Sequence, residues 1–387
     1  MPVLNRIAGY AAEMTEWRRW LHRNPELGFD LPKTSAFVAE RLREIGVDEV
    51  HEGIAQTGIV AIIRGQGDGP CIGLRADMDA LPIQEETGAD HASETEGRMH
   101  ACGHDGHTTM LLGAAKYLAE TRRFAGTVAL IFQPAEELGG GGQVMCEEGI
   151  MDRFGIGEVY GLHNTPDAEV GVFGTRSGPL LAAVDEFAID IKGVGGHAAW
   201  PHEAVDPLAA AVQVASALNT ILARNVPPLD RVVVSVTQIL GGTAHNVIPA
   251  SCFVGGTVRS FRKEAQELVR RRIGEICNGI AQAMNVEIEV TYEVGYPATV
   301  NHEAQTAFAA EVAREVVGPE KVDAARPPEM GAEDFSYMLE ARPGAFLFLG
   351  QGIGPMCHHP EFDFNDEAAP IGASFFARLV ERALPLA

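Results

Sequence analysis

The chain has 387 residues, of which 46% are hydrophobic and 21% are charged, and its formal net charge is −23. This length favours two domains and the apolar content excludes a disordered chain, while the negative charge disfavours binding to nucleic acid or to an anionic membrane. Six scattered cysteines without a CxxC pair predict a cytoplasmic protein with reduced thiols, and we expect neither a signal peptide nor a membrane-spanning segment.

The first half of the sequence alternates between helical and strand patterns. Apolar residues at helical spacing predict helices at residues 10–23, 34–46 and 108–120. Thr34 and Gly46 would begin and end the second of these helices. Short apolar runs predict buried strands at residues 58–64, 71–75, 127–132 and 158–162. Such alternation is typical of an α/β domain with a mainly parallel central sheet.

The middle of the sequence follows a different order. It predicts β-α-β-β-α-β, the ferredoxin-like arrangement, at residues 185–192, 206–224, 231–240, 251–260, 264–284 and 286–293. Helix and strand patterns of the first kind return at residues 305–317, 346–349 and 373–383. We therefore expect an α/β domain of residues 1–182 and 295–387, interrupted by a ferredoxin-like α+β domain of residues 183–294.

A glycine run at residues 139–142 invites comparison with a phosphate-binding loop. No Gly-Lys-Ser/Thr sequence follows the run, and no helical pattern begins there. We therefore expect a flexible loop beside a site, and the sequence disfavours a nucleotide-binding protein.

The densest group of metal-binding side chains is the sequence His-Ala-Cys-Gly-His-Asp-Gly-His at residues 100–107. Thiolate and imidazole groups are good ligands for Zn²⁺ and related ions, so Cys102 and His104 are candidate ligands. The alternative is a polar loop in which Asp105 and His107 cap the helix predicted at residue 108. We adopt that alternative for His100 and His107.

Two adjacent carboxylates, Glu136 and Glu137, follow the apolar run at residues 127–132. Open α/β sheets build their sites at the carboxyl ends of such strands. One carboxylate could bind a metal ion while the other faces a water molecule as general base. The alternative for the pair is an ordinary acidic loop.

Further candidates lie at other strand ends and near the C-terminus. His163 follows the strand at residues 158–162, and His358 lies in a Cys-His-His-Pro sequence. With the earlier candidates they supply enough ligands for two metal ions. Asp77 and Asp79 alternate on an extended segment, so both carboxylates could face one site as ligands or as orienting partners. Their alternative role is to cap a turn.

The inserted domain contributes polar residues that could contact a substrate. His197 follows two glycines that let the backbone approach closely. Asn246 and Arg259 could hydrogen-bond a carboxylate. For each residue alone, solvation at the surface is the alternative.

Eight segments of the sequence resemble, in the same order along the chain, motifs of the M20 family of metallo-amidohydrolases. The resemblance is to the branch of hippurate hydrolases, N-acyl-amino-acid aminoacylases and auxin-conjugate hydrolases. The segments cover residues 18–26, 74–82, 99–107, 132–137, 195–197, 245–249, 330–335 and 358–360. The resemblance implies that the α/β domain is catalytic and that the ferredoxin-like domain is a lid and dimerisation domain. This sequence differs from the wider family pattern at Asp77 and Cys102, where many relatives have His and Asp respectively. The aminoacylase branch shares both differences.

The resemblance also implies a set of ligands and catalytic residues. Cys102 would bridge two divalent metal ions per subunit, whether Zn²⁺, Mn²⁺, Co²⁺ or Ni²⁺, and Glu136 would be the general base with Asp79 supporting the site. The remaining metal ligands would be His104, Glu137, His163 and His358.

The activity implied by the resemblance is hydrolysis of N-acyl-L-amino acids to a carboxylic acid and a free amino acid. His197 would stabilise the oxyanion, reaching the site from the partner subunit of a homodimer or homotetramer, and Asn246 and Arg259 would hold the substrate carboxylate. Two alternatives stay open: a metallo-dipeptidase or exopeptidase on the same scaffold, and a catalytically silent metal-binding regulator.

Overall fold

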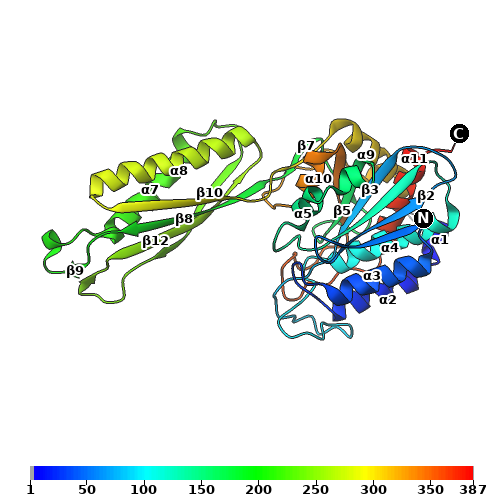
Figure 1. The fold of residues 1–387 in the computed structure, drawn as a ribbon, viewed down its shortest axis with the longest axis horizontal. Helices are drawn as coiled ribbons and strands as arrows, with labels where there is room; N and C mark the ends of the chain where they lie inside the picture. The colour runs from blue at the N-terminus through cyan, green and yellow to red at the C-terminus, as the bar shows by residue number, and fades with distance from the viewer. Residues whose placement is uncertain (1–3, 387) are drawn as a thin grey trace. The chain divides into compact units, whose positions relative to one another are not determined.

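The computed structural model describes residues 4–386 and divides the chain into two compact units (Figure 1). The first unit contains the chain up to Leu180, Thr299–Pro328 and the segment from Asp334 onward, and the second contains Leu181–Ala298 and Glu329–Glu333. Each unit has its own hydrophobic core. Within the described residues, no helix combines the length and the apolar character needed to cross a membrane.

The first unit is built around an eight-stranded sheet with the order β1-β2-β4-β3-β5-β16-β6-β15. Neighbouring strands from β4 to β16 run parallel, whereas β1 and β2 are antiparallel additions at one edge. The strands are β1 (Glu49–Ile54), β2 (Gly58–Arg64), β3 (Cys71–Asp77), β4 (Thr127–Gln133), β5 (Ile156–Thr165), β6 (Phe173–Gly174), β15 (Val322–Asp323) and β16 (Gly344–Gly350). Every residue of β3 and β16 is buried, because parallel strands are covered on both faces.

Helices pack around this sheet, and α4 contacts β3 as well as α2, α3 and α11. They are α1 (Asn5–Ala8), α2 (Ala11–Arg23), α3 (Pro32–Ile45), α4 (His104–Thr121), α5 (Gly141–Glu147), α6 (Ile150–Arg153), α9 (Glu303–Val317), α10 (Phe335–Ala341) and α11 (Ala369–Ala383), with the short 3-10 helix η2 (Pro319–Lys321). The predicted α/β class with a mainly parallel sheet is thus confirmed.

Helix α3 starts earlier than the sequence analysis predicted. Its first residue is Pro32, so Thr34 lies inside the helix and is not its N-cap. Pro suits the first helical position because its missing N–H would have no intrahelical partner. Glu26, which precedes the helix in the sequence, takes the role of an N-cap side chain. Its carboxylate accepts hydrogen bonds from the backbone N–H groups of Lys33 (3.1 Å) and Thr34 (2.9 Å). The helix ends at Gly46 as predicted, with φ at 81°.

Two further differences concern the residues at which α4 and α5 begin. Helix α4 begins at His104, four residues before the predicted start, so the expected capping loop is its first turn. The glycine run at residues 139–142, predicted as a loop without a helix, contains the start of α5 at Gly141. A Cβ atom on Gly141 would lie 1.7 Å from the carbonyl oxygen of Pro134, so only glycine permits this close turn.

The second unit contains a four-stranded antiparallel sheet with the order β10-β12-β8-β13. Its elements follow the predicted order: β8 (Ala183–Lys192), α7 (Pro207–Arg224), β10 (Val232–Leu240), β12 (Ser251–Ser260), α8 (Lys263–Met284) and β13 (Glu287–Val294). Its smaller elements are β9 (Gly196–His197), η1 (Pro201–Glu203) and β11 (Val247–Ile248). The remaining short strands, β7 (Gly178–Leu181) and β14 (Thr299–Asn301), pair with each other and belong to the first unit apart from Leu181. Asp206 caps α7 by accepting hydrogen bonds from Leu208 and Ala209.

Candidate metal centre

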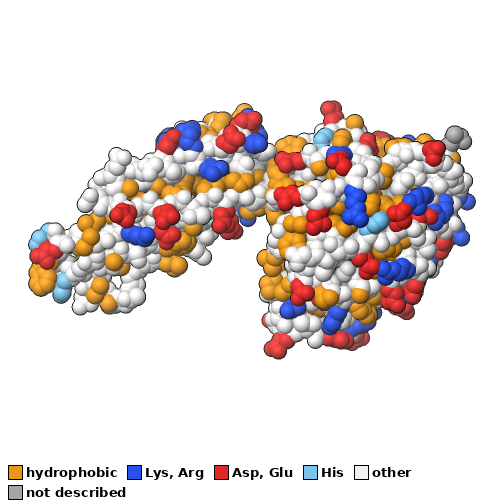
Figure 2. All heavy atoms as spheres, viewed as in Figure 1, with side chains coloured by type: hydrophobic (Ala, Val, Ile, Leu, Met, Phe, Trp, Pro, Cys, Tyr) orange, Lys and Arg blue, Asp and Glu red, His pale blue; other side chains and the backbone are white. Residues whose placement is uncertain are grey.

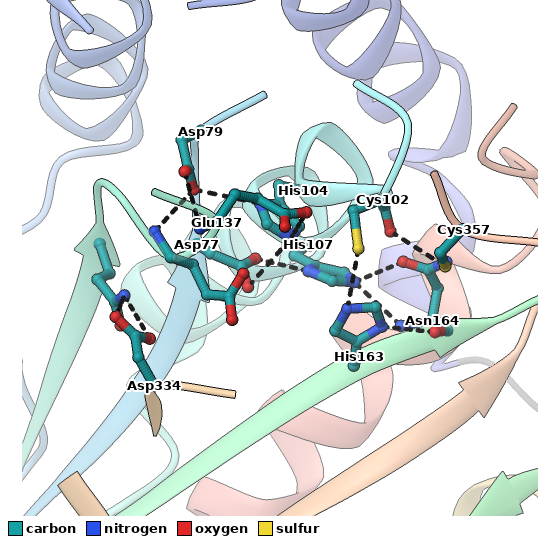
Figure 3. Close-up of polar contacts among 12 residues, drawn as sticks. Asp77, Asp79, Cys102, His104, His107, Glu137, His163, Asn164, Asp334 and Cys357 are labelled. Carbon is teal, nitrogen blue, oxygen red and sulfur yellow. Dashed lines mark hydrogen bonds and ion pairs between the residues drawn. The ribbon is translucent and has the colours of Figure 1, made fainter. Parts of the chain in front are cut away.

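Side chains from several elements of the first unit converge on one small volume (Figure 3). They come from the carboxyl end of β3, the loop after β4, the first turn of α4 and the end of β5. The carboxyl ends of parallel strands meet at one edge of a sheet, which is why residues distant in sequence gather here. The loop before α11 adds His358, whose backbone has a positive φ of 71°. Such left-handed backbone is unfavourable for histidine and often occurs at functional sites.

The five predicted ligands form two overlapping triads. The ligand atoms of Cys102, His104 and His163 lie within 4.8 Å of one another, and so do those of Cys102, Glu137 and His358. Sγ of Cys102 lies 3.4 Å from Nε2 of His163, and Oε1 of Glu137 lies 3.2 Å from Nε2 of His358. Cys102 belongs to both triads, so its sulfur is the donor that the two groups share.

The donors in these triads fit divalent metal ions. Nε2 of His104 is buried and has no hydrogen-bond partner among residues 4–386. It lies 3.6 Å from a carboxylate oxygen of Asp77 and 3.8 Å from one of Glu137, too far for a direct hydrogen bond. Leaving a buried polar atom unpaired is costly, and a cation between these groups would satisfy it. A set of thiolate, imidazole and carboxylate donors suits Zn²⁺ and related transition metals.

Electrostatics at the centre also favour a cation. Burial disfavours the charged form of His104, yet the carboxylates of Asp77, Asp79 and Glu137 raise its pKa to about 10. The negative potential responsible for this shift would equally attract a divalent cation. At His163, burial lowers the pKa, which keeps its imidazole in the neutral form that binds metals.

Asp79 holds the loop that carries the two glutamates. Its carboxylate accepts hydrogen bonds from the backbone N–H groups of Glu136 (3.0 Å) and Glu137 (3.1 Å). One of its oxygens also lies 3.3 Å from Nδ1 of His104, the second nitrogen of that ring. Asp79 therefore positions both a carboxylate and an imidazole of the centre, as a partner that orients metal ligands does.

Glu136 lies at the rim of the same centre. Its carboxylate forms a third group with the imidazole of His104 and the carboxylate of Glu137, with ligand atoms within 4.8 Å of one another. Only 7% of the residue is exposed to solvent. A carboxylate in this shielded position is close enough to exchange a proton with a water molecule held at the centre.

Sequence reasoning missed the role of His107. The residue lies inside α4, where its Nδ1 is 2.6 Å from Oδ1 of Asp77 and its Nε2 is 2.6 Å from Oδ1 of Asn164. It therefore connects β3, α4 and β5 directly beneath the ligands. The helical spacing of His104 and His107 was the available signal, because residues three apart share one face of a helix.

A second missed feature is a buried network beside Asp77. The guanidinium of Arg75 donates hydrogen bonds to Gln133 (2.8 Å), Asp77 (2.8 Å) and Asp334 (3.0 Å). Asp334 also accepts hydrogen bonds from Gln133 (2.7 Å) and from the backbone N–H of Gly142 (2.7 Å). The network ties β3 and β4 to the starts of α5 and α10. In the sequence, this network is indicated only by an arginine and a glutamine that lie within apolar strands.

The three remaining predicted residues belong to the second unit. His197 lies in β9 opposite Val247 of β11, so Asn246 is its close neighbour, and the backbone N–H of Ala198 donates to the carbonyl oxygen of Asn246 at 3.0 Å. Arg259 lies apart from them in β12, where its guanidinium donates to Thr257 at 2.5 Å. The structure thus brings His197 and Asn246 together, and the other eight candidates lie together in the first unit.

A pH-dependent contribution to stability is expected from His22, which lies behind the centre. Burial opposes its charge, but hydrogen bonds to Asp105 (2.8 Å) and Glu85 (3.3 Å) raise its pKa from 6.5 to about 9. A raised pKa means that this stabilisation is complete below pH 6.5 and is lost as pH rises through about 9. Across this pH window, the free energy of unfolding measured with urea should fall more steeply with pH for the wild type than for His22→Gln. The two slopes should differ by up to about 1.4 kcal/mol per pH unit. Equal slopes would contradict this assignment.

Gly141 provides a steric test of the loop that carries the glutamates. Gly141→Ala places a methyl group against the carbonyl oxygen of Pro134, so we expect about 1–3 kcal/mol of destabilisation and weaker metal binding. Gly274→Ala in α8 is the matched control, because a Cβ there meets nothing within 4 Å. It should be neutral or stabilise by up to about 1 kcal/mol through helix propensity. Urea unfolding distinguishes the two, and equal effects would show that the loop tolerates a side chain at position 141.

Comparisons with known proteins show what this chain is similar to. The profile of Peptidase family M20/M25/M40 matches residues 73–382. Hippurate hydrolase of Campylobacter jejuni is 40% identical over 99% of this chain and 100% of its own length, and N-acetyl-L-cysteine deacetylase of Bacillus subtilis is 44% identical over 93% and 85%. The crystal structure of Bacillus subtilis YxeP, described as a dinuclear metal binding peptidase from the M20 family, is 37% identical, with a TM-score of 0.85 over 97% of this chain and 99% of that one. The family resemblance in the sequence is thereby confirmed, and the chain belongs to Peptidase family M20/M25/M40.

Proposed function

We propose that this protein is a metal-dependent amidohydrolase that cleaves N-acyl-L-amino acids, of the hippurate or N-acetyl type, to a carboxylic acid and a free amino acid. The observation that carries the proposal is the pair of ligand triads that share Cys102, with the shielded carboxylate of Glu136 at their rim. The names of the two relatives that align over most of this chain, a hippurate hydrolase and an N-acetyl-L-cysteine deacetylase, support the substrate class.

The ligands proposed for the two metal ions are Cys102, His104, Glu137, His163 and His358. Divalent ions held there, such as Zn²⁺, Mn²⁺, Co²⁺ or Ni²⁺, would polarise the amide carbonyl and lower the pKa of a bound water. The soft thiolate of Cys102 favours transition metals over Mg²⁺ or Ca²⁺.

Glu136 carries out the proton transfers in the proposed mechanism. Its carboxylate accepts the proton of the water molecule that attacks the acyl carbonyl, and it then donates this proton to the nitrogen of the leaving amine. The C–N bond breaks and the acyl group leaves as a carboxylic acid. Asp79 keeps Glu136 in place through the hydrogen bond from the Glu136 backbone N–H, at 3.0 Å.

Residues of the second unit complete the proposal. We assign His197 to stabilisation of the oxyanion and Asn246 and Arg259 to the carboxylate of the substrate. The backbone N–H of Ala199 donates to Nδ1 of His197 at 3.1 Å, which leaves Nε2 as the nitrogen that can point toward a ligand. The second unit would serve as lid and dimerisation domain of a homodimer or homotetramer, with His197 supplied by the partner subunit. The free thiols of all six cysteines fit the proposed cytoplasmic location.

The proposed substrate class can be tested by free-amine release from a panel of hippurate, N-acetyl-amino acids, longer N-acyl-amino acids and dipeptides. Release from the acylated compounds at rates well above those for dipeptides would support the amidohydrolase. Release from dipeptides alone would favour an exopeptidase on this scaffold. A folded, metal-loaded protein that releases no amine from any compound would be a silent metal-binding protein.

A further inference from the structure

Two cysteines lie together at the metal centre. Cys102 is buried and Cys357 is half-buried, and they come from segments that lie side by side. Sγ of Cys357 also lies 3.8 Å from the carbonyl oxygen of Cys102 (Figure 3). The backbone N–H of His358 donates to the carbonyl oxygen of Ala101 at 2.7 Å, which holds the two thiol-bearing segments together.

The other cysteines occupy different surroundings. Cys71, Cys252 and Cys277 are buried in β3, β12 and α8. Cys146 is half-buried in α5, and it resembles Cys357 in exposure but lies outside the metal centre. Cys146 therefore offers a matched control for Cys357.

We propose that Cys102 and Cys357 form an oxidisable dithiol, which an oxidant of the peroxide class converts into an intramolecular disulfide. The sulfur of Cys357, the more exposed of the two, attacks one oxygen of hydrogen peroxide, becomes a sulfenic acid and releases one water molecule. The sulfur of Cys102 then attacks the sulfenic sulfur, forms the S–S bond and releases a second water molecule. The two sulfurs lose two electrons to the peroxide oxygens, and both thiol hydrogens leave in water.

The disulfide would act on both triads at once. A disulfide sulfur carries no negative charge and is a poor metal ligand, whereas thiolate is the form that binds metal. Because Cys102 belongs to both triads, its oxidation removes a donor from each. The dithiol would thus make metal binding reversibly sensitive to oxidation. This last consequence rests on the proposed metal centre, whereas disulfide formation itself does not depend on the proposed activity.

The test treats metal-free and Zn²⁺-loaded protein with a small excess of hydrogen peroxide, blocks the remaining thiols and maps the peptides by mass spectrometry. Zinc release is followed in parallel with a chromogenic chelator, before and after addition of a reductant. Wild type and Cys146→Ser should yield a peptide that links residues 102 and 357, bind zinc about tenfold or more weakly after oxidation, and recover with reductant. Cys357→Ser should form no such link and show no reductant-reversible loss of zinc.

Two results would overturn the proposal: no link between residues 102 and 357 in the wild type, or the same reversible zinc loss in Cys357→Ser. If Cys357→Ser fails to fold, peptide mapping of the wild type still decides the matter, and Cys357→Ala replaces the serine variant. A protein that forms the link but hydrolyses no amide would refute the proposed activity and leave the dithiol established.

Discussion

Replacing Glu136 by Gln is expected to lower kcat for amide hydrolysis by about 10²–10⁴-fold, because general-base catalysis contributes that much. Gln has nearly the same shape but cannot accept a proton at neutral pH. The hydrogen bond to Asp79 uses the backbone N–H of residue 136, so the loop should keep its conformation. Initial rates on hippurate at saturating substrate, measured together with bound metal, provide the test.

The control for this variant is Glu147→Gln on α5. Glu147 is exposed and its carboxylate accepts a hydrogen bond from Gln143 at 2.8 Å, away from the metal centre. Its rate and metal content should match those of the wild type. Near-normal turnover by Glu136→Gln with metal still bound would exclude Glu136 as the general base and move that role to another group.

Arg75→Leu is expected to destabilise the first unit by about 3–5 kcal/mol, the cost of removing one partner from a buried ion pair. Only 1% of Arg75 is exposed, and its guanidinium lies between the buried carboxylates of Asp77 and Asp334. Without it, two buried negative charges would lie near each other. The same Arg75 guanidinium opposes the effect of burial and holds the pKa of Asp77 well below its ordinary value, so the variant should also bind protons more readily.

Urea unfolding measures this loss, with Arg64→Leu as control. Arg64 makes an ion pair with Glu49 on the surface, and its side chain is 55% exposed. Exposed pairs contribute at most about 1 kcal/mol, so the control should unfold close to the wild type. Comparable stability of the two variants would show that the carboxylates of the buried network find other partners.

How far the fold follows from the sequence depends on the element. The bounds predicted for β2 and β12 agree with the structure, because continuous apolar or Val- and Thr-rich runs between turn residues define a strand locally. The start of α4 does not follow from local preference, since Gly103 and Gly106 are poor helix formers. Tertiary packing decides it: a Cβ on Gly106 would lie 2.3 Å from the ring of Phe364, so the glycine lets the first turn pack there.

In the candidate site, too, some neighbours follow from the sequence whereas others depend on tertiary packing. Glu137 and His163 could be predicted as neighbours because each lies close to the carboxyl end of a strand, and the topology of a parallel sheet brings such ends together. Cys102 lies just before α4, and its candidacy came from the dense group of metal-binding side chains around it. The partnership of Arg75 with Asp334 spans 259 positions in the sequence, and no local pattern announces it. The contact of the Cys357 sulfur with the carbonyl oxygen of Cys102 likewise spans 255 positions. Such contacts emerge only from the packing of the whole unit.

In the proposed mechanism, amide hydrolysis depends on metal held by the ligands around Cys102. Its most direct test is a titration of the metal-stripped protein with Zn²⁺, Mn²⁺ or Co²⁺ in which bound metal and amine release from hippurate or an N-acetyl-amino acid are recorded together. We expect no release without metal and a rate that rises with occupancy, up to two ions per chain. Full occupancy without amine release from any acylated substrate, or equal release in the presence of a strong chelator, would contradict it.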